Sequence, residues 1–178
     1  MQRYSFFAEN SQTRTHLLYK REEKQEERSK VSKISAIFAI EKQAIRRHYD
    51  QRRESTYWLD IANYDLDTAE AMYQTGRWLY VAFMCHQVIE KTLKAYWCGT
   101  QPDDPPYIHN HMRLAEGSGL YERMNDDQRD FLDTITNYNI EARYPEDKEE
   151  LSRILTEQFC RQIIDNTKQM QQWIKDRL

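Results

Sequence analysis

The chain has 178 residues, which is enough for one domain and an extension but not for two full domains. Apolar residues make up 39% and charged residues 31%, with only 4 Gly and 4 Pro, a composition that favours long helices and few turns. The net charge of −3 excludes a protein that binds polyanions through bulk positive charge alone.

The first part of the chain is basic, whereas the rest is acidic. Residues 1–55 carry 13 Lys and Arg against 8 Asp and Glu, and the remaining residues carry 13 against 21. Residues 1–29 show no apolar periodicity and are predicted to be disordered or a frayed helix. Residues 30–53 place Val31, Ile34, Phe38 and Ile45 at helical spacing and predict a basic amphipathic helix. Residues 1–54 are therefore expected to form an N-terminal extension, whose functional importance stays open.

The rest of the chain, residues 55–178, has the pattern of a helical domain. Ser55 or Thr56 is a candidate cap for its first helix, and Gly76 a stop signal for the same helix. Asn125 and Gln128 have the spacing of a capping box. Helices are predicted at about 56–75, 77–98, 111–116, 126–139 and 147–176, and no segment alternates like a strand. The predicted fold is all-α, an antiparallel bundle of four to five helices.

The cysteines and the apolar segments indicate the compartment. Cys85, Cys98 and Cys160 are an odd number without a disulfide spacing, which is typical of a reducing compartment. Residues 1–30 contain no apolar run of the signal-peptide kind, and residues 37–40 are too few to span a bilayer. A cytoplasmic protein without membrane contact is expected.

Three local motifs resemble one known family. Residues 58–69 place an aromatic residue, Ala, Asp-Leu and Ala at helical spacing, and residues 142–145 are Ala-Arg-Tyr-Pro. The most specific motif is an aromatic residue followed by His-Gln, Glu-Lys and Leu-Lys-Ala over residues 83–95. Together they resemble the HEPN family, named for higher eukaryotes and prokaryotes nucleotide-binding, over residues 55–178.

The resemblance implies a bundle that is usually a homodimer. Many members are partners of a minimal nucleotidyltransferase in toxin–antitoxin pairs, and others are ribonucleases that use an Arg-x4–6-His motif. In this chain Arg143 is followed by no His in that window, and Lys148 stands at the shortest spacing. Because lysine would need a large fall in its pKa to replace histidine, the ribonuclease interpretation is weakened.

The second motif also places polar side chains on one helix. His86 and Glu90 share a helix face, as do Glu90 and Lys94, and Lys91 lies beside them. One interpretation is a polar strip that binds a nucleotide, RNA or a partner protein. The other is an ordinary hydrogen-bonded pair with solvated lysines.

Two further groups of residues are candidate sites. Arg143 and Tyr144 precede the last predicted helix, where an arginine can bind phosphate and a tyrosine can stack on a base, although nearby carboxylates would repel phosphate. His109 and His111, with Cys98 upstream, match no standard zinc spacing, and loop or capping roles are favoured. The sequence therefore predicts no metal site and no cofactor.

Three functional hypotheses follow. The first is a binding module that performs no chemistry alone and uses His86, Glu90, Lys91, Lys94, Arg143 and Tyr144 to bind a nucleotide, RNA or a nucleotidyltransferase partner. The second is a metal-independent ribonuclease in which Lys148 or His111 replaces the missing histidine beside Arg143. The third is a helical adaptor that docks through residues 30–53.

Overall fold

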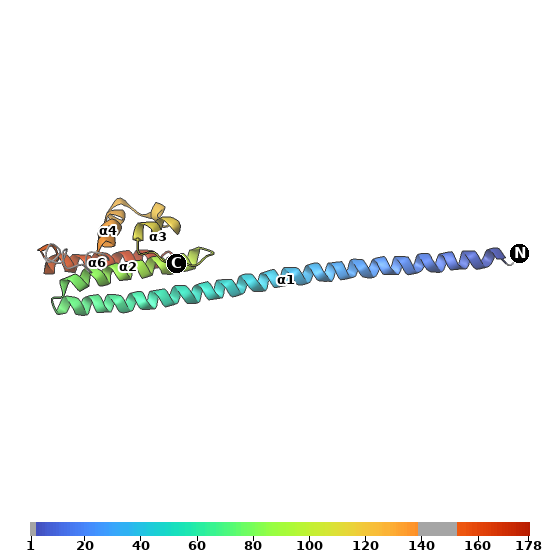
Figure 1. Cartoon of the computed structure of the whole chain (residues 1–178), viewed down its shortest axis with the longest axis horizontal. Coiled ribbons are helices and arrows are strands. Elements are labelled where there is room, and N and C mark those ends of the chain that lie inside the picture. Colours follow the sequence, from blue (N-terminus) through green and yellow to red (C-terminus); the bar gives the residue numbers. More distant parts are fainter. Residues whose placement is uncertain (1–2, 139–152) are drawn as a thin grey trace. The chain divides into compact units, whose positions relative to one another are not determined.

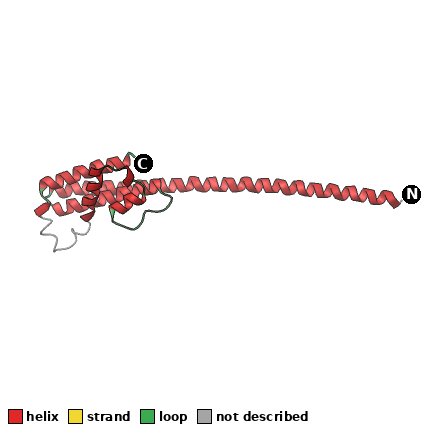
Figure 2. Ribbon diagram, turned by 90° about the horizontal axis from the view of Figure 1, so that it is seen from above, coloured by secondary structure: helices red, strands yellow, loops and turns green. Residues whose placement is uncertain are grey.

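The computed structural model describes residues 3–138 and 153–178, and all of the regular structure in these ranges is helical (Figures 1 and 2). The all-α prediction is thereby confirmed for the described chain. The helices are α1 (Arg3–Gln74), α2 (Trp78–Thr100), α3 (His111–Gly117), η1 (Tyr121–Arg123), α4 (Asp126–Asn137) and α6 (Glu157–Lys175). None of them is long and apolar enough to cross a membrane.

Helix α1 begins far earlier than the sequence indicated. Residues 3–29, predicted to be disordered or frayed, are helical, and no helix starts at Ser55 or Thr56. Instead, the Thr56 hydroxyl donates to the Arg52 carbonyl, 2.9 Å away, inside the helix. The physical reason is that the chain contains no Gly or Pro before Gly76, so nothing interrupts a segment rich in Glu, Lys, Gln and Arg.

By the packing of its backbone, the chain divides into two compact units between residues 48 and 49. The first unit, residues 1–48, is the N-terminal part of α1, and its apolar side chains Ile37, Phe38, Ile40 and Ile45 are exposed. The second unit, residues 49–178, contains the rest of α1 and all the other helices. It also contains the hydrophobic core that the described residues form, and it is the unit that positions the candidate site.

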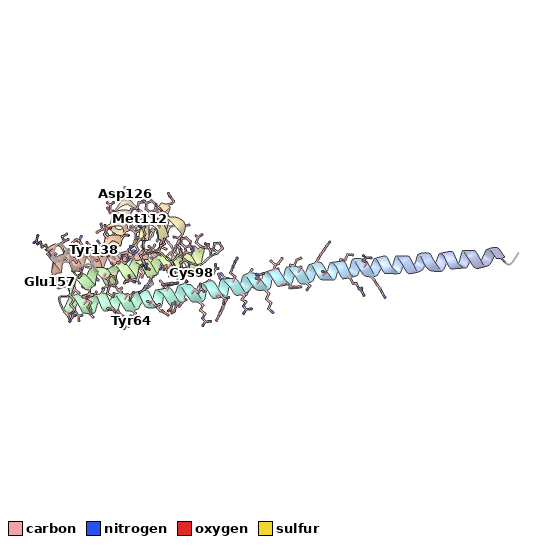
Figure 3. The ribbon with its side chains drawn as sticks, viewed as in Figure 1. Tyr64, Cys98, Met112, Asp126, Tyr138 and Glu157 are labelled. Carbon is pink, nitrogen blue, oxygen red and sulfur yellow. The ribbon has the colours of Figure 1, made fainter. Side chains whose placement is uncertain are left out.

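Helix α2 is the centre of the second unit. It lies beside α6. Helices α3 and α4, on which Met112 and Asp126 are labelled, pack across one side of α2, and Tyr64 of α1 lies on the other side (Figure 3). Ile89 and Leu93 of α2 are fully buried, as are Leu114 of α3 and Ile164 of α6. Because neighbours cover α2 on several sides, polar residues on it are buried too.

The helix ends follow local chemistry. At Gly76, with φ of +69°, the Arg77 N–H donates to the Met72 carbonyl at 2.9 Å and the Gly76 N–H to the Tyr73 carbonyl at 3.0 Å, which ends α1 in a Schellman motif. The predicted capping box of α4 is present: the Gln128 N–H donates to Asn125 Oδ1 and the Asn125 N–H to Gln128 Oε1. The sequence therefore predicted both of these helix boundaries.

The last helix differs from its prediction. Helix α6 begins at Glu157, whereas a helix from 147 was expected; Leu155 and Thr156 are not helical, and residues 139–152 lie outside the described structure. The Thr156 hydroxyl accepts the Phe159 N–H at 3.2 Å, so this residue caps a new helix instead of continuing an earlier one.

An ion-pair cluster joins α1 to α6 within the second unit. Arg161 donates two hydrogen bonds to the Glu70 carboxylate, at 3.0 and 2.9 Å, and Lys168 donates a third. The hydrogen bonds from Arg161 and, to a smaller extent, from Lys168 outweigh the opposing effect of burial and lower the pKa of Glu70 from 4.5 to about 2.

Replacing Glu70 with glutamine is expected to lower the free energy of unfolding by about 1 kcal/mol at pH 7. Because the folded state lowers the pKa of this carboxyl, its contribution is complete above about pH 4.5 and is lost as the pH falls towards 2. Urea unfolding at pH 7 and pH 3 measures the difference between wild type and E70Q. A difference that stays equal at the two pH values would contradict the assignment.

Candidate functional site: a buried histidine and glutamate cluster

Polar side chains from two helices and one loop meet inside the second unit. Helix α2 contributes His86, Glu90 and Lys94, which are spaced four residues apart and therefore share one face. Helix α3 contributes its first residue, His111, and the preceding loop contributes His109. We call these five residues the polar cluster. His86, Glu90, Lys94 and His111 are buried, and only the side chain of His109 is largely exposed, at 61%.

The imidazole of His86 is oriented by helix α4. Its Nδ1 lies 3.0 Å from the carbonyl oxygen of Ile135, which can only accept, so Nδ1 carries the proton. Its other nitrogen, Nε2, faces Glu90 Oε2 at 3.5 Å. The ring is fully buried, so this orientation is held by packing on every side.

Glu90 is the hub of the polar cluster. Its Oε1 accepts a hydrogen bond from Lys94 Nζ at 2.7 Å, and its Oε2 accepts one from His109 Nδ1 at 2.9 Å. Burial alone would raise the pKa of this carboxyl, but His86, Lys94 and His109 together hold it well below its usual range. Glu90 is therefore a carboxylate that is enclosed with its positive partner, and Lys94 also lies over the Trp58 ring, 5.1 Å from its centroid.

His111 is the least satisfied member of the polar cluster. Its ring is fully buried and lies 4.2 Å from the His86 ring, centroid to centroid. Neither of its nitrogens has a hydrogen-bond partner among the described residues. Burial, and secondarily the neighbouring His86, lowers the pKa of His111 well below 6.5. The ring is thus neutral at pH 7 and offers an unprotonated nitrogen.

The structure places only some of the predicted site residues together. His86, Glu90 and Lys94 meet inside the bundle instead of forming an open strip on its surface. Lys91 points elsewhere and donates to Asp65 of α1. Arg143, Tyr144 and Lys148 lie outside the described residues. His111, named for the ribonuclease hypothesis and as part of the His-x-His motif, is fully buried beside His86.

The contact between His111 and His86 was not predicted from the sequence. A sequence feature that indicates burial of His86 was present in α2, where residues 85, 88, 89 and 93 are apolar or small and surround the polar pair at 86 and 90. A polar pair within such a segment indicates burial, and a buried pair needs partners from another element. The His-x-His motif at 109–111 supplies them, although its spacing matches no zinc signature.

A second feature is a groove on the surface between α4 and α6. Its two adjoining hollows, of about 420 and 280 Å³, share Asp127, Phe131 and Asn166. The larger one is also lined by Trp173 and by the amide side chains of Gln128 and Gln169. Aromatic faces and amides make contacts with a partner protein or a nucleobase, and Lys and Arg are not among the lining residues.

Two observations point to one class of protein. The fold is a helical bundle, and its second helix, which holds three residues of the polar cluster, carries the His-Gln, Glu-Lys and Leu-Lys-Ala sequence. The family model of the HEPN domain matches residues 55–177. This chain belongs to the HEPN family.

Comparison with solved structures supports the same fold. The crystal structure of TT1696 from Thermus thermophilus matches with a TM-score of 0.62 and 18% sequence identity, over 70% of this chain and 98% of that one. At this identity the likeness shows the fold alone. The comparison with curated protein sequences found no significant match.

Proposed function

We propose that this HEPN protein is a nucleotide- or RNA-associated binding module, the partner of a minimal nucleotidyltransferase in a toxin–antitoxin-type pair, and that it acts as a homodimer without chemistry of its own. The observation that carries the proposal is the aromatic and amide-lined groove between α4 and α6. Glu90, Lys91 and Lys94 of α2, by contrast, are paired within the chain, and the groove is the contact surface that we propose.

The composition of the groove favours reversible recognition of another molecule. Phe131 and Trp173 supply apolar area, and Gln128, Asn166 and Gln169 supply donors and acceptors that can match a partner's backbone. Asp127 is the charged residue common to both hollows, so the groove favours a basic segment of the protein partner, and a nucleotide or RNA would be contacted there through its base instead of its phosphate.

The proposal is tested by producing the chain together with the protein encoded next to it. A stable complex with a minimal nucleotidyltransferase is expected. The Q169R substitution places a long cation in the groove and is expected to weaken that complex at least about tenfold, as a desolvated like-charge or steric clash does. The matched control is Q74R, at an exposed position at the end of α1, which should leave the affinity unchanged.

Two results would contradict the proposal. One is a neighbouring gene that encodes no nucleotidyltransferase, together with no complex when one is supplied. The other is cleavage of RNA by the purified chain that is abolished in R143A, since that would make the protein an enzyme. Light scattering of the purified chain tests the homodimer separately, and a monomer would remove that part.

A further inference from the structure

Three potential metal ligands converge at the centre of the polar cluster. One ring nitrogen of His86, one of His111 and one carboxylate oxygen of Glu90 all lie within 4.8 Å of one another, and all three residues are buried. In a tetrahedral site with bonds of about 2.0–2.1 Å, neighbouring ligand atoms are about 3.4 Å apart. The 3.5 Å between His86 Nε2 and Glu90 Oε2 already has this value.

The facing atoms of His86 and Glu90 require a positive charge between them. Because Nδ1 of His86 donates to the Ile135 carbonyl, the neutral ring turns the lone pair of Nε2 towards Glu90 Oε2. Two acceptors then face each other in a buried place, which is unfavourable. Either a proton or a metal cation on Nε2 removes the conflict.

His111 distinguishes between these two solutions. A proton on His86 pairs it with Glu90 but leaves both nitrogens of His111 without a partner among the described residues. A buried polar atom without a partner is unfavourable, because it loses its hydrogen bonds to water and gains none in the protein. A cation bound by His86, Glu90 and His111 satisfies all three side chains at once.

The surroundings also resemble those that orient metal ligands. The non-ligating nitrogen of His86 donates to a backbone carbonyl, which is the usual partner of a metal-bound histidine. Lys94 occupies Glu90 Oε1 and leaves Oε2 for a single bond to the ion. His109, whose side chain is largely exposed, is hydrogen-bonded to Oε2 and so links the buried carboxylate to the surface of the unit.

The charge of the site selects the kind of ion. Lys94 offsets the carboxylate, so attraction by net negative charge is weak and two imidazole nitrogens supply most of the binding. Ca²⁺ and Mg²⁺ need several oxygen ligands, whereas Zn²⁺ and related ions bind imidazole well. We propose that His86, Glu90 and His111 bind one Zn²⁺-class transition-metal ion, with the fourth position left to water. This differs from the prediction made from the sequence, which was no metal.

The test uses the full chain, without a histidine tag and freed of metal by a chelator, titrated with Co²⁺ as a coloured probe. We expect one Co²⁺ per chain, with the visible absorption of a four-coordinate site, and displacement by Zn²⁺. The H111A substitution is expected to weaken Co²⁺ binding at least about 100-fold, because it removes a ligand rather than an outer partner. The matched control H48A, at an exposed position of α1, should bind as wild type does.

Circular dichroism establishes that H111A is folded. Should it be unfolded, X-ray absorption of the wild-type Co²⁺ complex decides, with two imidazoles and one carboxylate expected at the ion. Absence of stoichiometric binding by the wild type would overturn the proposal and leave a proton or an ordered water in the polar cluster. Binding that persists in folded H111A, or a spectrum without two imidazoles, would overturn it equally.

Discussion

Replacing Glu90 with glutamine is expected to reduce the free energy of unfolding by about 3–5 kcal/mol, since removing one partner of a buried ion pair leaves the other uncompensated. The side chain of Lys94 is only 8% exposed and that of Glu90 only 5%. The neutral amide cannot offset the Lys94 ammonium. Urea unfolding of the metal-free protein at pH 7, followed by circular dichroism, measures the loss.

The control for E90Q is E116Q, at an exposed position of α3, with an expected change within about 0.5 kcal/mol. The double variant E90Q/K94M is expected to be more stable than E90Q alone, because it also removes the Lys94 ammonium that E90Q leaves without a negative partner. A loss below about 1 kcal/mol in E90Q would show that the polar cluster is hydrated instead of enclosed.

The second large effect is expected for Ile89→Ala in the core. Ile89 is fully buried on α2, one residue before Glu90, so the substitution should leave a cavity and cost about 2–5 kcal/mol. Ile154→Ala makes the same chemical change at a side chain that is 50% exposed, and should cost less than about 1 kcal/mol. Equal losses in the two variants, measured by urea unfolding, would contradict the central position of α2.

The elements of the bundle that could be predicted from sequence are those governed by local chemistry. The capping box at Asn125 and Gln128, and the stop at Gly76, depend on a few neighbouring residues whose hydrogen bonds are the same in any protein. Apolar periodicity located α2 and α3 within one or two residues of their observed ends.

The predictions that failed concern long helices. The predicted start of α1 lies more than fifty residues too late, because Ser55 and Thr56 resemble a cap although Thr56 bonds within the helix. The opposite error occurs before α6, where continuous apolar spacing concealed the cap at Thr156. At such a position the hydrogen bond of a capping side chain competes with the backbone hydrogen bonds of a continuing helix. Which of the two forms depends on the neighbouring residues.

The candidate site was predictable only in part. The spacing of His86, Glu90 and Lys94 shows that they share a helix face, but only packing against α3 and α4 reveals that this face is buried. The meeting of His86 with His111 joins residues 25 positions apart, and no local pattern contains that contact.

The enclosure of the polar cluster is tested most directly by chemical modification of the full chain with diethyl pyrocarbonate. Site-by-site mass spectrometry should find His48 and His109 modified in the folded protein, since both side chains are exposed, and His86 and His111 protected until urea unfolds the chain. Modification of His86 or His111 in the folded chain at the rate of His48 would contradict the account.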